Sequence, residues 1–283
     1  MLGRALIRLI DAQDAWARPF GDWLHGLADA IFRRIVPIRS LLNGTWLGHP
    51  LHAVLTDVPI GALLLVIVLD VLGQPVGADV ALTLGILAML ASAVIGFADY
   101  SVTDGKARAR ATVHSTLMIV ALLVYLVSFG LRAAGPADRT VPIGLSVLAF
   151  LILSAGAYVG GDVVFALGNM VDRHAWRPAG AKWQPLEVGD LPDDTPVKAR
   201  LGLQNLVVVR SGETIHALHD QCAHAGGPLS GGRLVDGCIE CPWHASRFEL
   251  ATGRRRRGPA VYDQPAYEVR PAEGGGYEAR RMS

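Results

Sequence analysis

Apolar residues are concentrated in four long blocks between residues 48 and 175, namely 51–73, 80–98, 111–131 and 141–161. Each block has about 19–23 residues, enough at about 1.5 Å per residue for a helix to cross a hydrocarbon core of roughly 30 Å. Because the four blocks follow one another with only short turns, the pattern predicts four transmembrane helices. Buried helices of a soluble protein would not repeat such runs four times.

Residues 1–47 show a different periodicity. Apolar side chains recur there at helical spacing with charged residues between them: Trp16, Phe20, Trp23, Leu24, Leu27, Ile31 and Ile35. The spacing predicts an amphipathic N-terminal helical segment. Two interpretations remain open. The helix lies on the membrane surface or a partner, or it packs on the protein's own bundle.

Beyond a linker at residues 176–183, short β-branched runs alternate with Gly, Pro and Asp. This pattern is typical of strands joined by tight turns, and it predicts an all-β domain at residues 184–283. The expected fold is therefore an α-helical membrane bundle of four transmembrane helices, at residues 48–175, followed by an all-β domain.

Composition agrees with a membrane protein. Charged residues make up 18% of the chain, against about 25% in ordinary soluble domains, and hydrophobic residues make up 51%. The 26 Lys and Arg nearly balance 25 Asp and Glu, which argues against a nucleic-acid partner. Three cysteines are too few for a disulfide framework.

Basic residues near the block ends are unevenly distributed. One side has many: Arg33, Arg34, Arg39, Lys106, Arg108, Arg110, Arg173, Arg177 and Lys182. The other side has only Arg132 and Arg139. By the positive-inside rule, both termini and the β domain face the cytoplasm. The first residues do not have the pattern of a cleaved signal peptide.

The β domain contains a C-x-H pair and a C-x-x-H pair separated by 16 residues: Cys222, His224, Cys241 and His244. Two thiolates and two imidazoles are a possible tetrahedral zinc site. Zinc fingers, however, usually place Cys with Cys and His with His. Here each pair supplies one of each.

This arrangement resembles the Rieske iron–sulfur family, supported by the flanking residues GGPL at 226–229 and CPWHASRF at 241–248. The resemblance implies a 2Fe–2S cluster in which Cys222 and Cys241 hold one iron and His224 and His244 the other. Neutral imidazoles in place of two thiolates raise the cluster potential. A bound imidazole also loses its remaining proton more readily when the iron is ferric, which makes the potential depend on pH.

The loops around the ligands carry further expectations. Backbone N–H groups are expected to approach the sulfurs, helped by three residues of the first loop: Gly226, Gly227 and Pro228. High-potential family members have a disulfide between the two loops, but Gly227 and Trp243 occupy those positions here. The family's serine donor is present as Ser246, whereas Phe248 replaces its tyrosine donor. The resemblance therefore implies a ferredoxin-like potential.

Two features lie outside the ligand pattern. Cys238 is interpreted as a core thiol rather than a redox partner. Four consecutive arginines, Arg254, Arg255, Arg256 and Arg257, form either a solvated hairpin or a docking patch for anionic lipid or an acidic redox partner.

Ionisable residues at membrane depth are costly and suggest a function. Five are candidates for a haem or quinone site: His49, His52, Asp57, Asp99 and His114. His49 and His52 are three residues apart, a spacing that puts both on one helical face. Three interpretations stay open. One of these two histidines and His114 are the axial ligands of a b-type haem, or the histidines and aspartates bind a quinone headgroup and transfer its protons. Alternatively, they form hydrogen bonds that hold the helices together.

The stretch GHPLHAVLTDVPIG, with FADY and VHST further on, resembles an uncharacterised bacterial four-helix membrane family with an H-P-x-H…D-x-P-I-G signature. Some members of that family are fused to a Rieske module. The resemblance supports the architecture and implies a multi-pass protein of the bacterial inner (cell) membrane. It implies no activity.

Together these patterns predict a membrane-anchored Rieske electron-transfer protein. Its redox partner is a quinone or haem in the bundle, or a soluble reductase. The alternative is a redox-sensing or accessory subunit of a respiratory or oxygenase complex, with the bundle acting only as an anchor. An oxygenase needs a separate iron site with two histidines and a carboxylate. No such site is expected here, and a role within a quinol-linked oxidoreductase stays open.

Overall fold

The structure, a computed structural model, describes residues 2–176 and 182–282. Arg177 and most of the predicted linker 176–183 lie outside the described residues. The chain forms two compact units. The first comprises Met1–Ile38 and Leu51–Asn169, and the second comprises Arg39–Pro50 and Met170–Ser283.

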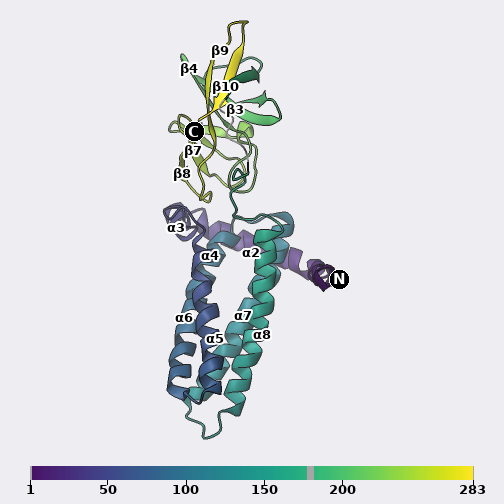
Figure 1. Cartoon of the computed structure of the whole chain (residues 1–283), viewed down its shortest axis with the longest axis vertical. Helices are drawn as coiled ribbons and strands as arrows, with labels where there is room; N and C mark the ends of the chain where they lie inside the picture. Colours follow the sequence, from purple (N-terminus) through teal and green to yellow (C-terminus); the bar gives the residue numbers. More distant parts are fainter. Residues whose placement is uncertain (1, 177–181, 283) are drawn as a thin grey trace. The chain divides into compact units, whose positions relative to one another are not determined.

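The first unit is helical, and four of its segments are long and apolar enough to cross a membrane. Its long helices run side by side as a bundle (Figure 1). In chain order the helices are α1 (Leu2–Asp11), α2 (Asp14–Phe32), α3 (Val36–Leu42, which continues into the second unit), α4 (Leu51–Leu55), α5 (Asp57–Val71), α6 (Pro75–Tyr100), α7 (Gly105–Ala133) and α8 (Thr140–Phe165). The predicted four-helix membrane bundle is confirmed.

The first apolar block is not one continuous helix, because it is divided at Thr56 into α4 and α5. Pro59 has no N–H to donate to the carbonyl of Leu55, so one hydrogen bond of the helical ladder is missing. The Thr56 hydroxyl instead donates to the carbonyl of Ala53 at 3.0 Å. The division separates His52, on α4, from the long part of the span.

Apolar side chains from α5 to α8 form the core of the bundle. Leu63, Val66, Leu82 and Tyr125 are fully buried there. Gly85 lets α5 and α6 approach closely, since a Cβ at this position would lie 2.5 Å from the Leu63 side chain. Such close contacts between small and large residues are how helices associate in lipid.

Charged side chains within the bundle are paired. Arg132 contacts Asp70 at 2.5 Å and Asp79 at 3.1 Å, near the end where α5 meets α6. At the other end of α7, Arg110 pairs with Asp162 of α8. Ionisable side chains inside membrane bundles are usually paired in this way, because an unpaired charge at membrane depth is costly.

The second unit is built of strands, which confirms the predicted all-β domain. Six strands close a barrel in the order β1 (Gln184–Glu187), β10 (Tyr277–Arg281), β9 (Ala266–Pro271), β4 (Thr214–His219), β3 (Gln204–Ser211) and β2 (Val197–Leu201). A smaller sheet has the order β5 (Arg233–Val235), β6 (Cys238–Glu240), β7 (Arg247–Glu249) and β8 (Arg255–Arg257). Neighbouring strands are antiparallel in both.

Strand β3 is buried on both faces and divides two cores. Because successive side chains of a strand point to opposite sides, Leu206 and Val208 fill the barrel while Val207 and Val209 face a second core. That second core contains Cys222 and Cys241. The barrel strand β3 therefore packs directly against the core that contains the two candidate ligand loops.

Candidate metal centre

The four candidate ligands lie on two loops, each anchored by strands. The first loop follows β4 and carries Cys222 and His224. The second joins β6 to β7 and carries Cys241 and His244. Three of the four side chains are buried, and His244 is half-buried.

Like ligands meet across the two loops. The Cys222 thiol is hydrogen-bonded to Cys241. The His224 and His244 rings have centroids 4.9 Å apart and stand at 87° to each other. Both ring nitrogens of His224 are buried, and no hydrogen-bond partner for them is found among the described residues. Buried imidazole nitrogens without such partners are expected where the ring binds a metal.

Backbone amides surround both sulfurs. The N–H groups of His224 and Ala225 donate to Cys222, and the amides that follow Cys241 donate to its sulfur. The hydrogen bond from Cys222 lowers the pKa of Cys241 to about 7, although burial acts in the opposite direction. The same hydrogen bond, together with burial, raises the pKa of Cys222. The amides favour negative sulfur, the form that binds iron.

The His224 imidazole is held in its neutral form. Burial places the pKa of His224 well below its ordinary value, and the neighbouring His244 lowers it further. A neutral imidazole is the metal-binding state of histidine. Two cysteines and two histidines together match the ligand set of a mixed cysteine–histidine cluster.

Gly227 forms a cradle beside the sulfur of Cys241. A Cβ at this position would lie 3.0 Å from the Cys241 Sγ and 2.9 Å from the Trp243 ring. The preceding Gly226 has φ +87°, a conformation that favours glycine. Its N–H donates to the carbonyl of Cys222 at 2.9 Å. Glycine at both positions lets the loop close tightly on the ligands.

Pro228 and Ser246 make contacts that hold the two ligand loops in place. Pro228 pairs with Gln221 in an isolated β-bridge that closes the first loop. Ser246 is fully buried, its carbonyl accepts the N–H of Cys241 at 2.8 Å, and its hydroxyl oxygen accepts the N–H of Ala260 at 3.0 Å. The Ser246 hydroxyl proton is not used by that bond and is free to donate elsewhere.

The arrangement fits a two-iron cluster better than a single ion. Among the described residues, no three His, Cys, Asp or Glu side chains gather closely enough to hold one metal ion. The ligands instead form a thiol pair and an imidazole pair, each suited to one iron of a 2Fe–2S cluster. The alternative of a tetrahedral zinc site is not favoured by this geometry.

Gln264 was not apparent from the sequence, yet it holds the first loop in place. Its Nε2 donates to the carbonyls of His219 at 2.6 Å and Gln221 at 2.8 Å, and its Oε1 accepts the N–H of Ala223 at 2.9 Å. Gln264 lies just before β9, about 40 residues from the loop it supports. No local spacing signal connects it with the cysteine and histidine pairs.

Comparison with known proteins identifies the module. Residues 182–268 match the family model described as Rieske [2Fe-2S] domain. The anthranilate 1,2-dioxygenase ferredoxin subunit of Burkholderia cepacia is 33% identical over 95 residues, which are 33% of this chain and 88% of that protein. Ferredoxin CarAc of Metapseudomonas resinovorans is 36% identical over 80 residues, 28% of this chain and 75% of that protein.

The chain belongs to the Rieske [2Fe-2S] family.

The membrane domain also matches a family model, and the Rieske module is similar to a solved structure. Residues 48–173 match the model described as Predicted membrane protein (DUF2231), so the Rieske module is fused to a membrane domain, as the sequence predicted. A chain of the solved "Complex of reduced oxygenase and oxidized ferredoxin in carbazole 1,9a-dioxygenase" is 30% identical with a TM-score of 0.32, over 36% of this chain and 97% of that chain.

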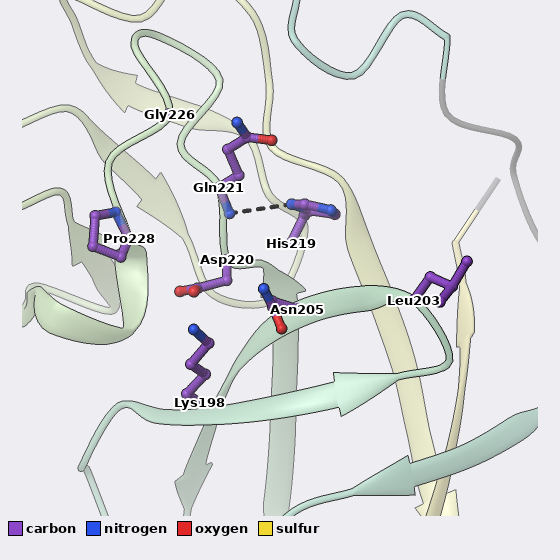
Figure 2. Close-up of a pocket in the computed structure, with 8 residues that line it drawn as sticks. All are labelled: Lys198, Leu203, Asn205, His219, Asp220, Gln221, Gly226 and Pro228. Carbon is purple, nitrogen blue, oxygen red and sulfur yellow. Dashed lines mark hydrogen bonds between the residues drawn. The ribbon is translucent and has the colours of Figure 1, made fainter.

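A hollow of about 420 Å³ opens beside the first ligand loop of the Rieske module (Figure 2). Gly226 and Pro228 of the loop line it, together with His219 and Gln221. The Gln221 N–H donates to His219 Nδ1 at 3.1 Å, and the His219 ring packs on His174 at 4.7 Å between centroids. These contacts fix the side of the loop that faces the barrel.

Cys238 and most of the arginine run are engaged within the Rieske module. Cys238 is buried in β6, and burial raises the pKa of its thiol, as expected for a core residue. Arg255 donates to the Thr45 carbonyl at 3.1 and 2.6 Å. The next two arginines pair with glutamates, Arg256 with Glu249 and Arg257 with Glu240. Arg254 is exposed. These contacts favour the hairpin interpretation for three of the four side chains.

Glu240, next to Cys241, is surrounded by arginines. It is buried and contacts Arg233 at 2.7 Å and Arg247 at 2.6 Å, with Arg257 at 3.4 Å. Burial by itself raises the pKa of this carboxyl, but the hydrogen bonds from Arg247 and Arg233 outweigh it and lower the pKa. A buried carboxylate with three guanidinium partners ties β5, β6, β7 and β8 together.

In the first unit, the structure brings together two of the candidate membrane residues. His52 on α4 and His114 on α7 have ring centroids 6.3 Å apart at 82°. Each ring lies against a glycine of another helix, because a Cβ at Gly96 would lie 2.8 Å from His52 and one at Gly160 would lie 2.9 Å from His114. His114 Nδ1–H donates to the carbonyl of Gly156 at 2.8 Å.

The other candidates are placed differently. His49 lies before α4 begins at Leu51 and belongs to the second unit, so the expectation that it shares a helical face with His52 is wrong. The cause is Pro50, which disfavours helical backbone in the residue before it. Asp57 is exposed at the start of α5, and Asp99 is half-buried near the end of α6.

Proposed function

We propose that the protein is a membrane-anchored electron-transfer protein whose 2Fe–2S cluster is held by Cys222, Cys241, His224 and His244. The observation that carries the proposal is the buried thiol pair beside the imidazole pair, each formed across the two loops. The cluster supplies one-electron transfer when bound. The curated relatives named as ferredoxin components support the same role.

The residues around the ligands support electron transfer at a ferredoxin-like potential. Amide N–H groups directed at both sulfurs stabilise negative charge, which increases when an electron arrives. Phe248 is fully buried and provides no hydroxyl donor. Fewer donors to the cluster lower its potential, in keeping with a ferredoxin and not with a high-potential centre.

Two kinds of redox partner are candidates. A soluble reductase or oxygenase is the partner type suggested by the relatives' names. A quinone or haem in the bundle is suggested by His52 and His114. A histidine that ligates metal usually donates its other ring nitrogen to a carbonyl, as His114 Nδ1 does, which keeps its Nε2 available for a ligand.

We further propose that the protein resides in a bacterial inner membrane with the Rieske module in the cytoplasm. On the opposite side, the two arginines of the charge count pair with aspartates, Arg132 with Asp70 and Arg139 with Asp79. The orientation rests on the larger number of Lys and Arg residues near the span ends on the other side, which is the count that sets topology. A C-terminal reporter active only in the periplasm tests it, and strong reporter activity contradicts it.

The first experiment is a reduced-minus-oxidised optical spectrum with electron paramagnetic resonance on the detergent-purified protein. A Rieske signal is expected. If sharp b-type haem bands accompany it, the bundle conducts electrons. A Rieske signal alone directs the search to quinol and to soluble partners. Absence of any 2Fe–2S signal in protein with full iron content contradicts the proposal.

A redox-sensing accessory subunit, with the bundle only as an anchor, is the second candidate. It is favoured by contacts within the second unit, where the stretches that precede α4 and follow α8 touch the cluster module. Arg173 Nε donates to the His224 carbonyl at 3.2 Å, and Arg255 binds the Thr45 carbonyl. Hydrogen exchange at residues 39–50 and 170–176 tests this function, which requires a difference between oxidised and reduced protein.

A further inference from the structure

Helix α2 has three distinct faces, and two of them contact other helices of the protein. At 100° per residue, Ala17, Gly21 and Ala28 fall on one stripe, and all three are buried. Charged residues occupy a second stripe: Asp14, Arg18, Asp22, Asp29 and Arg33. A third stripe carries only large apolar residues: Trp16, Phe20, Trp23, Leu27 and Ile31.

The small-residue stripe packs against two membrane-spanning helices. A Cβ at Gly21 would lie 2.5 Å from the Thr112 Oγ1 and 3.0 Å from the Tyr100 hydroxyl. The Tyr100 hydroxyl donates to the Gly21 carbonyl at 3.0 Å. Tyr100 is the last residue of α6, and Thr112 lies two turns into α7. Helix α2 is therefore fixed at the level where these two spans end.

The charged stripe faces the start of α7. Asp22 contacts Arg108 at 2.7 Å, and Arg108 is one turn closer to the start of α7 than Thr112. Asp11, just before α2, likewise contacts Lys106 at 3.1 Å. Because the basic residues at this end of the span mark its aqueous side, the charged stripe of α2 points toward water.

The apolar stripe lies roughly 160° around the helix from the charged stripe. It therefore points along the spans, toward their apolar middle. All five side chains are exposed in the described part of the chain, with Trp23 at 63%. Trp23 also stacks on Phe20 with ring centroids 5.7 Å apart. The stripe is therefore apolar and exposed, and its two tryptophans combine a large apolar ring with a polar indole N–H.

We propose that α2 lies in the plane of the membrane and buries this apolar stripe in the boundary between lipid headgroups and acyl chains. Lipid is favoured as the partner of this stripe because α2 packs against two spans whose outer surfaces are also apolar and exposed. That exterior includes Leu90 and Val94 of α6 and Ile119 of α7, all exposed. Tryptophan at such a depth is typical of membrane interfaces.

The placement has a physical consequence for the whole bundle. A helix whose three sides meet protein, lipid and water has one favourable depth and one favourable rotation. Since Gly21 joins α2 to both α6 and α7, the lipid boundary fixes the ends of those two spans as well.

The test uses the full-length protein reconstituted into phosphatidylcholine vesicles, with and without phospholipid brominated near the headgroup end of its acyl chains. Bromine quenches tryptophan fluorescence only at close range. The W16F/W23F variant keeps apolar rings at both positions, so folding is preserved. We expect it to lose a large part of the emission that bromine quenches in the wild type.

W183F is the matched control. The Trp183 ring lies against the guanidinium groups of Arg270 at 4.0 Å and Arg280 at 4.7 Å in the β module. Its removal is expected to leave the bromine-quenched emission unchanged. If W16F/W23F retains the full bromine-quenched emission of the wild type, the stripe is not in lipid and the proposal is overturned.

Discussion

Two pairs of imidazoles with similar internal geometry occupy different settings in this molecule. His224 and His244 have ring centroids 4.9 Å apart at 87°, and His52 and His114 have centroids 6.3 Å apart at 82°. The first pair is accompanied by two cysteines and by amides directed at their sulfurs. The second is accompanied by glycines and one backbone carbonyl.

The difference indicates what makes an imidazole pair a redox centre. An iron–sulfur cluster carries negative charge, which thiolates supply and N–H groups stabilise. The membrane pair has neither thiolates nor amides directed at it in the part of the chain that the structure describes, so a group bound between its rings has to bring its own charge balance. Variants that alter one pair and leave the other intact separate the two settings, and their effects on the cluster are expected to differ in size.

The largest effect is expected from Gly227→Ala. The added Cβ would lie about as close to the Cys241 Sγ as to the Trp243 ring, at 3.0 and 2.9 Å, so the loop has to move off the ligand. We expect purified protein to lose most of its iron and its Rieske signal. Iron content and electron paramagnetic resonance measure this.

The control is Gly231→Ala in the neighbouring 3-10 turn. There a Cβ meets only Pro242 at 3.9 Å and Pro228 at 4.0 Å, which are ordinary contacts. This variant is expected to keep its cluster. Equal iron content in Gly227→Ala and Gly231→Ala would contradict the cradle.

A smaller effect is expected from His224→Cys, which keeps four ligands. A thiolate adds negative charge, so the 2Fe–2S cluster is retained and its potential falls on the order of a few hundred mV, the difference between Rieske and all-cysteine clusters. Redox titration followed by electron paramagnetic resonance measures the shift. His216→Cys, on β4 outside the ligand loops, is the control. An unchanged potential in His224→Cys would mean that the ligand assignment is wrong.

The same contrast explains how much the sequence predicted. The four candidate ligands could be proposed from the sequence because cluster chelation uses two short local motifs, whose spacing can be seen along the chain. The four spans were predictable because lipid requires long uninterrupted apolar runs. Gln264 was not, since it reaches the first loop from about 40 residues away through tertiary contacts alone.

The membrane residues illustrate the same limit. Helical spacing joined His49 to His52, but Pro50 ends that relation and α4 begins only at Leu51. The ring that His52 contacts is His114, 62 residues later in the chain, which the sequence had already named as a candidate for the same site. The space for the two rings is provided by Gly96 and Gly160. Glycine is common in membrane spans, so these two positions did not predict the ring contact from the sequence.

Gln264→Ala is expected to leave the cluster potential unchanged and to weaken the fold around it. The change removes three hydrogen bonds and leaves the His219 and Gln221 carbonyls and the Ala223 N–H without that partner. Loss of buried hydrogen bonds costs about 1–3 kcal/mol of unfolding free energy. Urea titration followed by cluster absorbance measures it.

Gln204→Ala is the matched control for that measurement, since among the described residues its side-chain amide makes one hydrogen bond, which its Oε1 accepts from the Tyr267 hydroxyl at 2.5 Å. A smaller loss of stability is expected there. If both variants unfold at the same urea concentration, Gln264 does not hold the first ligand loop.

The smallest effect on the cluster is expected from His114→Ala, which alters only the membrane pair. Because the ring is joined to Gly156 of α8 and not to any ligand of the cluster, the Rieske signal and its potential are expected to stay as in the wild type. If the wild type has b-type haem bands, the variant is expected to lose them. If it has none, reduction of the cluster by quinol is expected to slow.

His25→Ala, on α2 and half-buried, is the control. Haem bands or quinol reduction that persist unchanged in His114→Ala would remove this residue from any redox role, and the pair would then be one of the hydrogen-bonded contacts that hold helices together in lipid.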